Sequence, residues 1–172
     1  MNEGCRSQNG SIIGVIHQMF IVDGGNDTLI TDMLVSTGDD LTERKRLLLD
    51  NGDCVLVLPG GIGTFDEMVE TISSKSLKFR GLTSVPICIL NIDGYYDGFI
   101  TQLKRAEQDG MLYDNFNSYV HVETCPKAAV AWVESELQRN DWVSSRLNRN
   151  KLRSTMEAAQ AVSGENGRVA LR

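Results

Sequence analysis

The sequence predicts an α/β protein with a parallel β-sheet, because short apolar runs alternate with stretches of helical periodicity. Four runs have the length and composition of buried strands: 11–16, 53–58, 85–91 and 119–122. Strands that are separated by helices form parallel sheets. A glycine-rich turn, Pro59-Gly60-Gly61, directly follows the second of these runs. Parallel sheets bind ligands at the carboxyl ends of their strands, so this turn is the first candidate site.

Helices are expected between and after these strands, where apolar residues recur at helical spacing. The expected ranges are 39–50, 64–79, 97–109 and a last helix that starts at Pro126, and residues 1–10 have the pattern of a helix end. Asp39 and Asp40 suit the first turn of the first of these. Residues 29–35 alternate weakly between polar and apolar, which leaves a further short strand open. This order predicts a Rossmann-like sheet with helices on both faces.

The turn after the second strand has the composition of an anion site. Glycines continue to Gly63, and a helical pattern follows. Glycine allows a sharp bend and the close approach of a ligand, while the first N–H groups of the helix point at that ligand. Glu67 lies about one turn into the helix, near enough to act on a bound group. On the glycines alone, a purely geometric role in the strand-to-helix turn remains equally open.

A longer string of residues resembles a known family. Pro59-Gly60-Gly61-x-Gly63-Thr64-x-x-Glu67 is similar to the PGGxGTxxE signature of the LONELY GUY family, the cytokinin riboside 5′-monophosphate phosphoribohydrolases, also labelled possible lysine decarboxylases. Three further segments resemble family elements. Glu43-Arg44-Lys45 is similar to the M-x-x-R-K segment, although Leu41 stands near the position of its methionine. Residues 90–96 are similar to the N-x-x-G-Y-Y/F stretch, and residues 13–16 are similar to the G-V-I-P strand, with His17 in place of the proline. The resemblance covers about residues 1–138.

The resemblance implies an activity and a set of site residues. The implied reaction cleaves the N-glycosidic bond of a nucleoside 5′-monophosphate to a free base and ribose 5-phosphate, with no metal or organic cofactor. Glu67 would stabilise the positive charge of the transition state and activate water, and Arg44 would hold the phosphate. The remaining implied substrate-binding residues are Lys45, Pro59, Gly60, Gly61, Gly63 and Thr64. The family also implies a homodimer with the site near the subunit interface.

Other interpretations remain open at this stage. The decarboxylase label implies pyridoxal phosphate, which needs a Schiff-base lysine, but the lysines are scattered and none stands in a recognisable cofactor motif. A nucleotide-binding protein without catalytic activity is the main alternative. Without the resemblance, the basic cluster Arg44–Arg46 would be a solvated helix face, and His17, a lone histidine at a strand end, is more often structural.

Composition narrows the protein class. A chain of 172 residues with 41% hydrophobic residues favours one domain with a substantial core. The net charge of −6 argues against binding to nucleic acid, and no apolar run approaches the length of a membrane span. The four cysteines (Cys5, Cys54, Cys88 and Cys125) form no C-x-x-C pair, which argues against zinc. A reduced, cytoplasmic protein fits this composition best, and the family resemblance implies that its ligand is a small nucleoside monophosphate.

The two ends of the chain differ from its middle. Family members carry a G-S-S turn and a G-G-G turn upstream, and neither is present here, so we expect a fold that lacks its N-terminal part. Residues 139–172 hold seven Lys/Arg and three acidic residues. The expected organisation is therefore an α/β domain over 1–138, followed by a basic helix and a partly disordered tail over 139–172.

Overall fold

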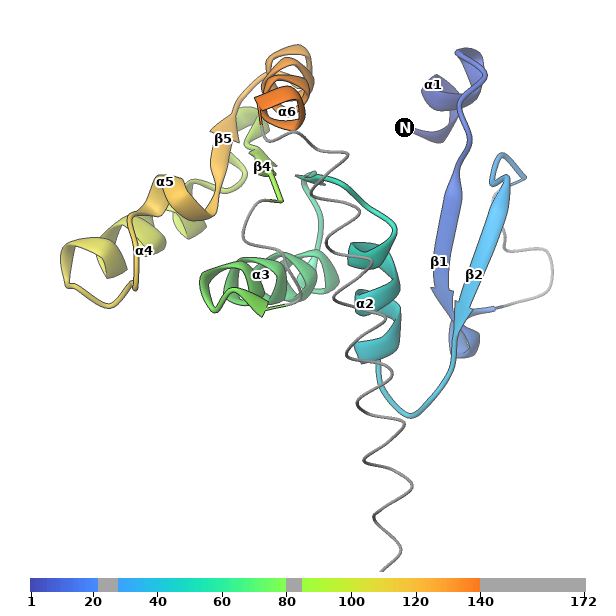
Figure 1. Cartoon of the computed structure of the whole chain (residues 1–172), viewed down its shortest axis with the longest axis horizontal. Helices are drawn as coiled ribbons and strands as arrows, with labels where there is room; N and C mark the ends of the chain where they lie inside the picture. The colour runs from blue at the N-terminus through green and yellow to red at the C-terminus, as the bar shows by residue number, and fades with distance from the viewer. Residues whose placement is uncertain (22–27, 80–84, 140–172) are drawn as a thin grey trace, which may run out of the picture. The chain divides into compact units, whose positions relative to one another are not determined.

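The computed structural model describes residues 1–21, 28–79 and 85–139, which belong to two compact units (Figure 1). Unit 1 comprises Met1–Gly52, and unit 2 comprises Asp53–Arg172. Each unit has its own parallel sheet. The basic helix and tail predicted for residues 139–172 lie outside the described residues, apart from Arg139, which ends the last described helix.

Unit 1 is a two-stranded parallel sheet with one long helix packed against it. Its elements are α1 (Asn2–Ser7), β1 (Ile13–His17), the 3₁₀ helix η1 (Gln18–Phe20), β2 (Asp32–Ser36) and α2 (Thr42–Asp50). The register pairs Ile13 with Asp32 and His17 with Ser36. The weak alternation of residues 29–35 therefore does form a strand. Both strands end on the same side, where His17 and Ser36 are buried.

The start of α2 differs from the prediction. The helix begins at Thr42, so Asp39 and Asp40 precede it instead of forming its first turn. The Asp40 carboxylate accepts a hydrogen bond of 2.9 Å from the Thr42 backbone N–H. Hydrogen bonds from Thr42 lower the pKa of Asp40. Short acidic side chains compete with the helix for backbone N–H groups in this way, which favours them just before a helix.

Unit 2 contains a three-stranded parallel sheet in the order β3-β4-β5. Its elements are β3 (Val55–Val57), α3 (Ile62–Ser76), β4 (Ile87–Leu90), the 3₁₀ helix η3 (Ile92–Gly94), α4 (Asp97–Gln108), α5 (Phe116–Tyr119), β5 (His121–Glu123) and α6 (Pro126–Arg139). Every predicted strand is found, although each is shorter than predicted or shifted. Helix α3 begins two residues before the predicted Thr64, and α5 replaces the start of the predicted last strand.

Alternate residues of β4 face opposite sides of this sheet. Ile87 and Ile89 are buried in one cluster with residues of α3, α4 and α5, including Met68 and Ile100. Cys88 and Leu90 are buried in a second cluster with Ala129 and Val133 of α6. Helices therefore cover both faces, as predicted, which explains why β4 is a continuous apolar run rather than an alternating one. No helix within the described ranges has the length and apolarity to cross a membrane.

Candidate functional site

The glycine-rich turn lies at the carboxyl end of β3, as the sequence predicts. Strand β3 ends at Val57 and α3 begins at Ile62, with Gly61 as the N-cap in extended backbone conformation (φ −90°, ψ −158°). The N-cap residue Gly61 has no side chain that could cap this helix end, and the first turn of α3 contains no acidic residue. The first N–H groups of α3 therefore point out of the helix at a positively polarised end.

The glycines of the turn have different structural roles. A Cβ atom on Gly60 would overlap the side chain of Thr64, whose own Cβ would be only 2.8 Å away. Gly61 and Gly63 are different, because an added Cβ at either would meet no described atom within 4 Å. Packing thus explains the glycine at position 60, whereas the other two leave exposed backbone that a ligand can approach.

Two tyrosines that follow β4 hold the turn in place. The Tyr96 hydroxyl donates to the Leu58 carbonyl at 2.7 Å, and the Tyr95 hydroxyl donates to the Gly60 carbonyl at 2.6 Å. The Tyr96 ring also makes edge-to-face contacts with Phe65 and with Tyr95. The resemblance of residues 90–96 to a family element does not by itself predict these two hydrogen bonds, and the adjacent pair Tyr95-Tyr96 is their only signal in the sequence.

Asn91 fixes the corner that positions the tyrosines. Its side-chain oxygen accepts from the Tyr96 backbone N–H at 2.7 Å, and its amide donates to the Asp97 carboxylate at 2.8 Å. Its own backbone N–H donates to the Glu123 carbonyl at 2.7 Å, which ties the end of β4 to β5. Gly94 has a φ of +74°, a conformation that favours glycine. The N-x-x-G-Y-Y pattern therefore encodes a rigid corner.

Glu67 lies on α3 close to the turn. It is four residues after Gly63 and three after Thr64, so these three residues share one helix face. Glu67 is partly exposed, whereas the next residue, Met68, is only 2% exposed and packs in the core. The backbone carbonyl of Glu67 accepts a 2.6 Å hydrogen bond from the Thr71 hydroxyl. The structure thus places Glu67 about one helical turn from the glycine turn within unit 2.

Arg44 and Lys45 belong to unit 1, where they lie near the start of α2. The Arg44 Nε donates to the Val15 carbonyl of β1 at 3.3 Å. The preceding residue, Glu43, accepts a 2.8 Å hydrogen bond from the Thr37 backbone N–H, just after β2. These contacts anchor the start of α2 to its own sheet. The association of Arg44 and Lys45 with the turn of unit 2 remains a prediction.

His17 is buried at the carboxyl end of β1. Its Nδ1 accepts a hydrogen bond of 3.2 Å from the Met19 backbone N–H, which places the proton of the neutral ring on Nε2. The ring is 2% exposed, and its Nε2 has no hydrogen-bond partner in the described part of the chain. The Nδ1 contact supports the structural role that sequence analysis favours. Among the residues described, no group of three or more His, Cys, Asp or Glu side chains is arranged to hold a metal ion.

Comparisons with known proteins agree with this arrangement. The sequence profile of the family described as "Possible lysine decarboxylase" matches residues 1–133. The chain is 38% identical over 73 residues to "Cytokinin riboside 5'-monophosphate phosphoribohydrolase LOG5" of Arabidopsis thaliana, covering 42% of this chain and 31% of the relative. It is 34% identical over 110 residues to the probable enzyme LOGL9 of Oryza sativa subsp. japonica, and this match covers 64% of this chain and 46% of the relative.

A longer but more distant match covers most of the chain. The probable cytokinin riboside 5'-monophosphate phosphoribohydrolase LOGL3 of Oryza sativa subsp. japonica is 26% identical over 151 residues, which is 80% of this chain and 70% of the relative. Against LOG5, LOGL2 and LOG6 the matched part is only 31%, 45% and 48% of the relative's length. The chain therefore spans less than half the length of several curated relatives.

Proposed function

Because the chain belongs to the possible lysine decarboxylase family, in its LONELY GUY branch, we propose that it hydrolyses the N-glycosidic bond of a nucleoside 5′-monophosphate. The substrate is a cytokinin riboside 5′-monophosphate or adenosine monophosphate, and the products are the free base and ribose 5-phosphate. The observation that carries this proposal is the N-terminus of α3 at the glycine turn, where the N-cap residue Gly61 has no capping side chain, with Glu67 on the same helix face.

The phosphate of the substrate binds at the glycine turn. Exposed backbone at Gly61 and Gly63 allows close approach, and the N–H groups of the first turn of α3 donate to phosphate oxygens. Thr64 adds a hydroxyl, and Pro59 with Gly60 shapes the entry to the turn. Arg44 supplies the compensating positive charge, since a guanidinium can hold a phosphate with two parallel hydrogen bonds, and Lys45 adds to the field.

Glu67 carries the chemistry of bond cleavage. Breaking an N-glycosidic bond develops positive charge on the sugar ring, as in other glycoside hydrolyses. A fixed carboxylate stabilises that charge, and the same group can accept a proton from the attacking water. With the phosphate at the start of α3, a carboxylate one turn along the helix lies within reach of a ribose. The base departs and ribose 5-phosphate remains.

The proposal extends to the state of the protein. We expect a cytoplasmic homodimer in which the site lies near the subunit interface. The four cysteines are free in the structure, which is consistent with a reducing compartment. The main alternative is a protein that binds nucleotides without turnover. This alternative is retained because the chain matches only 31% of LOG5 and 48% of LOG6.

One assay separates the two functions. The full chain is incubated with adenosine monophosphate and, separately, with a cytokinin riboside monophosphate, while ribose 5-phosphate and free base are quantified. Hydrolysis predicts equal amounts of both products, and plain nucleosides should react far more slowly because they lack the phosphate. Saturable nucleotide binding with no product would establish the alternative, and absence of both binding and turnover would exclude both functions.

A further inference from the structure

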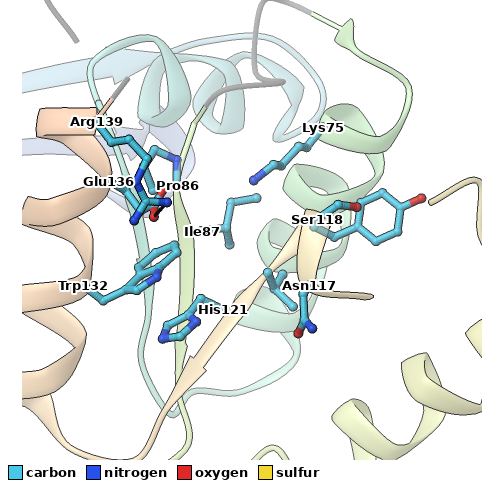
Figure 2. A pocket seen from close by; sticks show the side chains of 11 residues that line it. Lys75, Pro86, Ile87, Asn117, Ser118, His121, Trp132, Glu136 and Arg139 are labelled. Carbon is cyan, nitrogen blue, oxygen red and sulfur yellow. Dashed lines mark ion pairs between the residues drawn. The ribbon is translucent and has the colours of Figure 1, made fainter. Parts of the chain in front are cut away.

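Unit 2 contains a cavity at the amino-terminal ends of its strands, whereas the glycine turn lies at their carboxyl ends. Its volume is about 370 Å³, and it is lined by Pro86 and Ile87, where β4 begins, and by Val120 and His121, where β5 begins (Figure 2). The glycine turn follows the carboxyl end of β3, and all three strands are parallel. The cavity is therefore distinct from the proposed nucleotide site.

A partly buried ammonium group lies at this cavity. Lys75, near the end of α3, donates from Nζ to the Val85 carbonyl at 2.9 Å. Figure 2 shows its side chain reaching into the cavity from the side opposite Trp132. Burial lowers the pKa of Lys75, and the negative charge of Glu136 counteracts this only in part. A desolvated cation of this kind is stabilised by an anion that comes within contact distance.

The acidic residue of the cavity is already paired. Glu136 Oε1 and Arg139 Nη1 are 2.7 Å apart on the last turns of α6. The Arg139 side chain is 70% exposed and that of Glu136 is 17% exposed, so the guanidinium extends into solvent at the rim. With this pair neutral, the charge balance of the cavity wall is positive through Lys75. Asn117 adds a side-chain amide to the lining.

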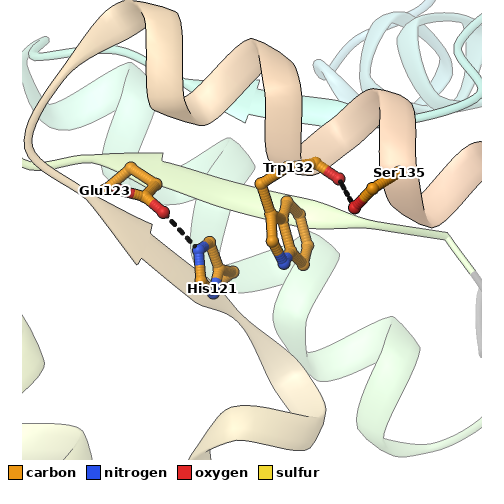
Figure 3. Close-up of polar contacts among 4 residues, drawn as sticks. All are labelled: His121, Glu123, Trp132 and Ser135. Atoms are coloured by element: carbon orange, nitrogen blue, oxygen red, sulfur yellow. Dashed lines mark hydrogen bonds and ion pairs between the residues drawn. The ribbon is translucent and has the colours of Figure 1, made fainter.

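A flat aromatic pair forms another wall. The rings of His121 and Trp132 are stacked at a centroid distance of 4.3 Å and an interplanar angle of 8°. His121 Nε2 and Glu123 Oε1 are 2.8 Å apart, which fixes the orientation of the imidazole (Figure 3). Ser135 donates to the Trp132 carbonyl at 2.8 Å within α6. This wall is rigid and apolar on its faces, which suits the carbon body of a small ligand.

We propose that this cavity binds a small organic oxyanion, a phosphate ester or a carboxylate, between Lys75 and Arg139 and against the His121–Trp132 wall. The cavity exceeds the space of one water molecule, about 30 Å³, by roughly tenfold, so it accommodates a charged group together with a short carbon body. The ligand adds negative charge beside Lys75, for which Glu136 compensates only in part. Nothing in this proposal depends on the activity proposed for the glycine turn.

The test is a nuclear magnetic resonance titration of the full chain. Glycerol 3-phosphate and glycerate share a three-carbon body and differ in the oxyanion, so they separate a phosphate site from a carboxylate site. The readouts are the Trp132 indole N–H signal, assigned with Trp132→Phe, and the pKa of Lys75, which should rise on binding. Glycerol and sodium chloride at matched ionic strength control for the carbon body and for screening.

Matched arginine variants decide the outcome. Arg139→Gln should weaken binding roughly tenfold, the usual effect of losing a charge-assisted hydrogen bond. Arg105→Gln is the control, because Arg105 also pairs with an acidic residue at 2.7 Å and is 68% exposed, but on α4. Lys75→Met should abolish saturable binding of the oxyanion in the titration. A Trp132 signal that moves no further than in sodium chloride, or equal weakening by both arginine variants, would overturn the proposal.

Discussion

The hydroxyl of Tyr96 donates a 2.7 Å hydrogen bond to the carbonyl of Leu58, the residue that leads from β3 into the glycine turn. Tyr95 makes the corresponding bond to Gly60, two residues further along the turn. Tyr96 is 1% exposed, whereas Tyr95 is 51% exposed. Adjacent residues thus hold one turn at two points, one in the core and one at the surface, and this difference makes them a matched pair for mutation.

Removing the two hydroxyls should have unequal effects on stability. Tyr96→Phe removes this donor from the partly buried Leu58 carbonyl and should lower the free energy of unfolding by about 1–2 kcal/mol. Tyr95→Phe should lower it by less than about 0.5 kcal/mol, because water can replace the exposed hydroxyl. Urea unfolding followed by circular dichroism measures both. Equal losses of unfolding free energy would show that the Tyr96 hydrogen bond stabilises the protein no more than the exposed Tyr95 bond does.

The glycines of the turn should separate packing from ligand access. Gly60→Ala places a methyl group against Thr64 and should lower the free energy of unfolding by about 1–3 kcal/mol. Gly63→Ala is in open space in the first turn of α3, where alanine is the better helix former, so stability should stay the same or rise by up to about 1 kcal/mol. If Gly63 admits a phosphate, this variant should still lose nucleotide affinity. Unchanged affinity would show that the phosphate does not approach the backbone at Gly63.

Glu67→Gln should abolish turnover while nucleotide binding persists. The side chain keeps its size and loses only its negative charge, so the rate of ribose 5-phosphate release should fall by at least about 100-fold. Asp66→Asn is the control, since it removes the same charge from the neighbouring position, which lies on a different face of α3. Near-normal activity in Glu67→Gln, or equal losses in the two variants, would remove Glu67 from the catalytic role.

Arg44→Ala should weaken binding of a nucleoside 5′-monophosphate far more than binding of the plain nucleoside. Loss of a charged hydrogen bond to phosphate corresponds to roughly 10- to 100-fold in affinity. Arg44→Lys should restore only part of it, because lysine cannot bind a phosphate with two parallel bonds. Calorimetric titration with adenosine monophosphate and adenosine provides the comparison. A similar loss for both ligands would mean that Arg44 does not contact the phosphate.

The buried thiol of Cys88 should make the fold sensitive to alkali. Burial raises the pKa of Cys88 from 9.0 to about 11. Between these values the unfolded chain loses a proton that the native protein retains, so the free energy of unfolding should fall as pH rises through this window, by at most about 1.4 kcal/mol per pH unit.

Two variants isolate that dependence. Cys88→Ala should be less stable at neutral pH, because it leaves a small cavity, but its stability should decline less steeply in alkali. The lowered pKa of Lys75 acts in the opposite direction and is present in both proteins, so it cancels in the difference. Parallel stability curves for the two proteins over this window would contradict the assignment. Denaturant midpoints across the pH series provide the measurement.

The sequence predicts the strands and the turn well because both depend on local composition. An apolar run such as 85–91 is unfavourable in contact with water and is therefore buried, and the Pro-Gly-Gly sequence cannot continue a strand. The start of α2 is not predictable in the same way, since Asp40 can stand in the first turn or before it. The position of the Thr42 N–H decides between these choices.

The candidate site is only partly predictable for a different reason. The turn and Glu67 lie within nine residues of one another in sequence, from Pro59 to Glu67, and their proximity follows from helical geometry. The tyrosine bonds join positions 35 and 38 residues apart, and no local pattern specifies which carbonyl a phenol will reach. The sequence does not predict the short α5, because its signal, Asn115 accepting from the Ser118 N–H, is a single capping residue.

The span of the tyrosine bonds also bears on the order of folding. Closing a loop of 35 or 38 residues has an entropic cost that must be met before the contact contributes any stability. We therefore expect the glycine turn to reach its final conformation only after β4 has paired with β3 and the Asn91 corner has closed. On this expectation, a chain that had not yet reached that step would lack a formed anion site. Ligand binding is thus expected to report on the last folding events of unit 2, later than secondary structure does.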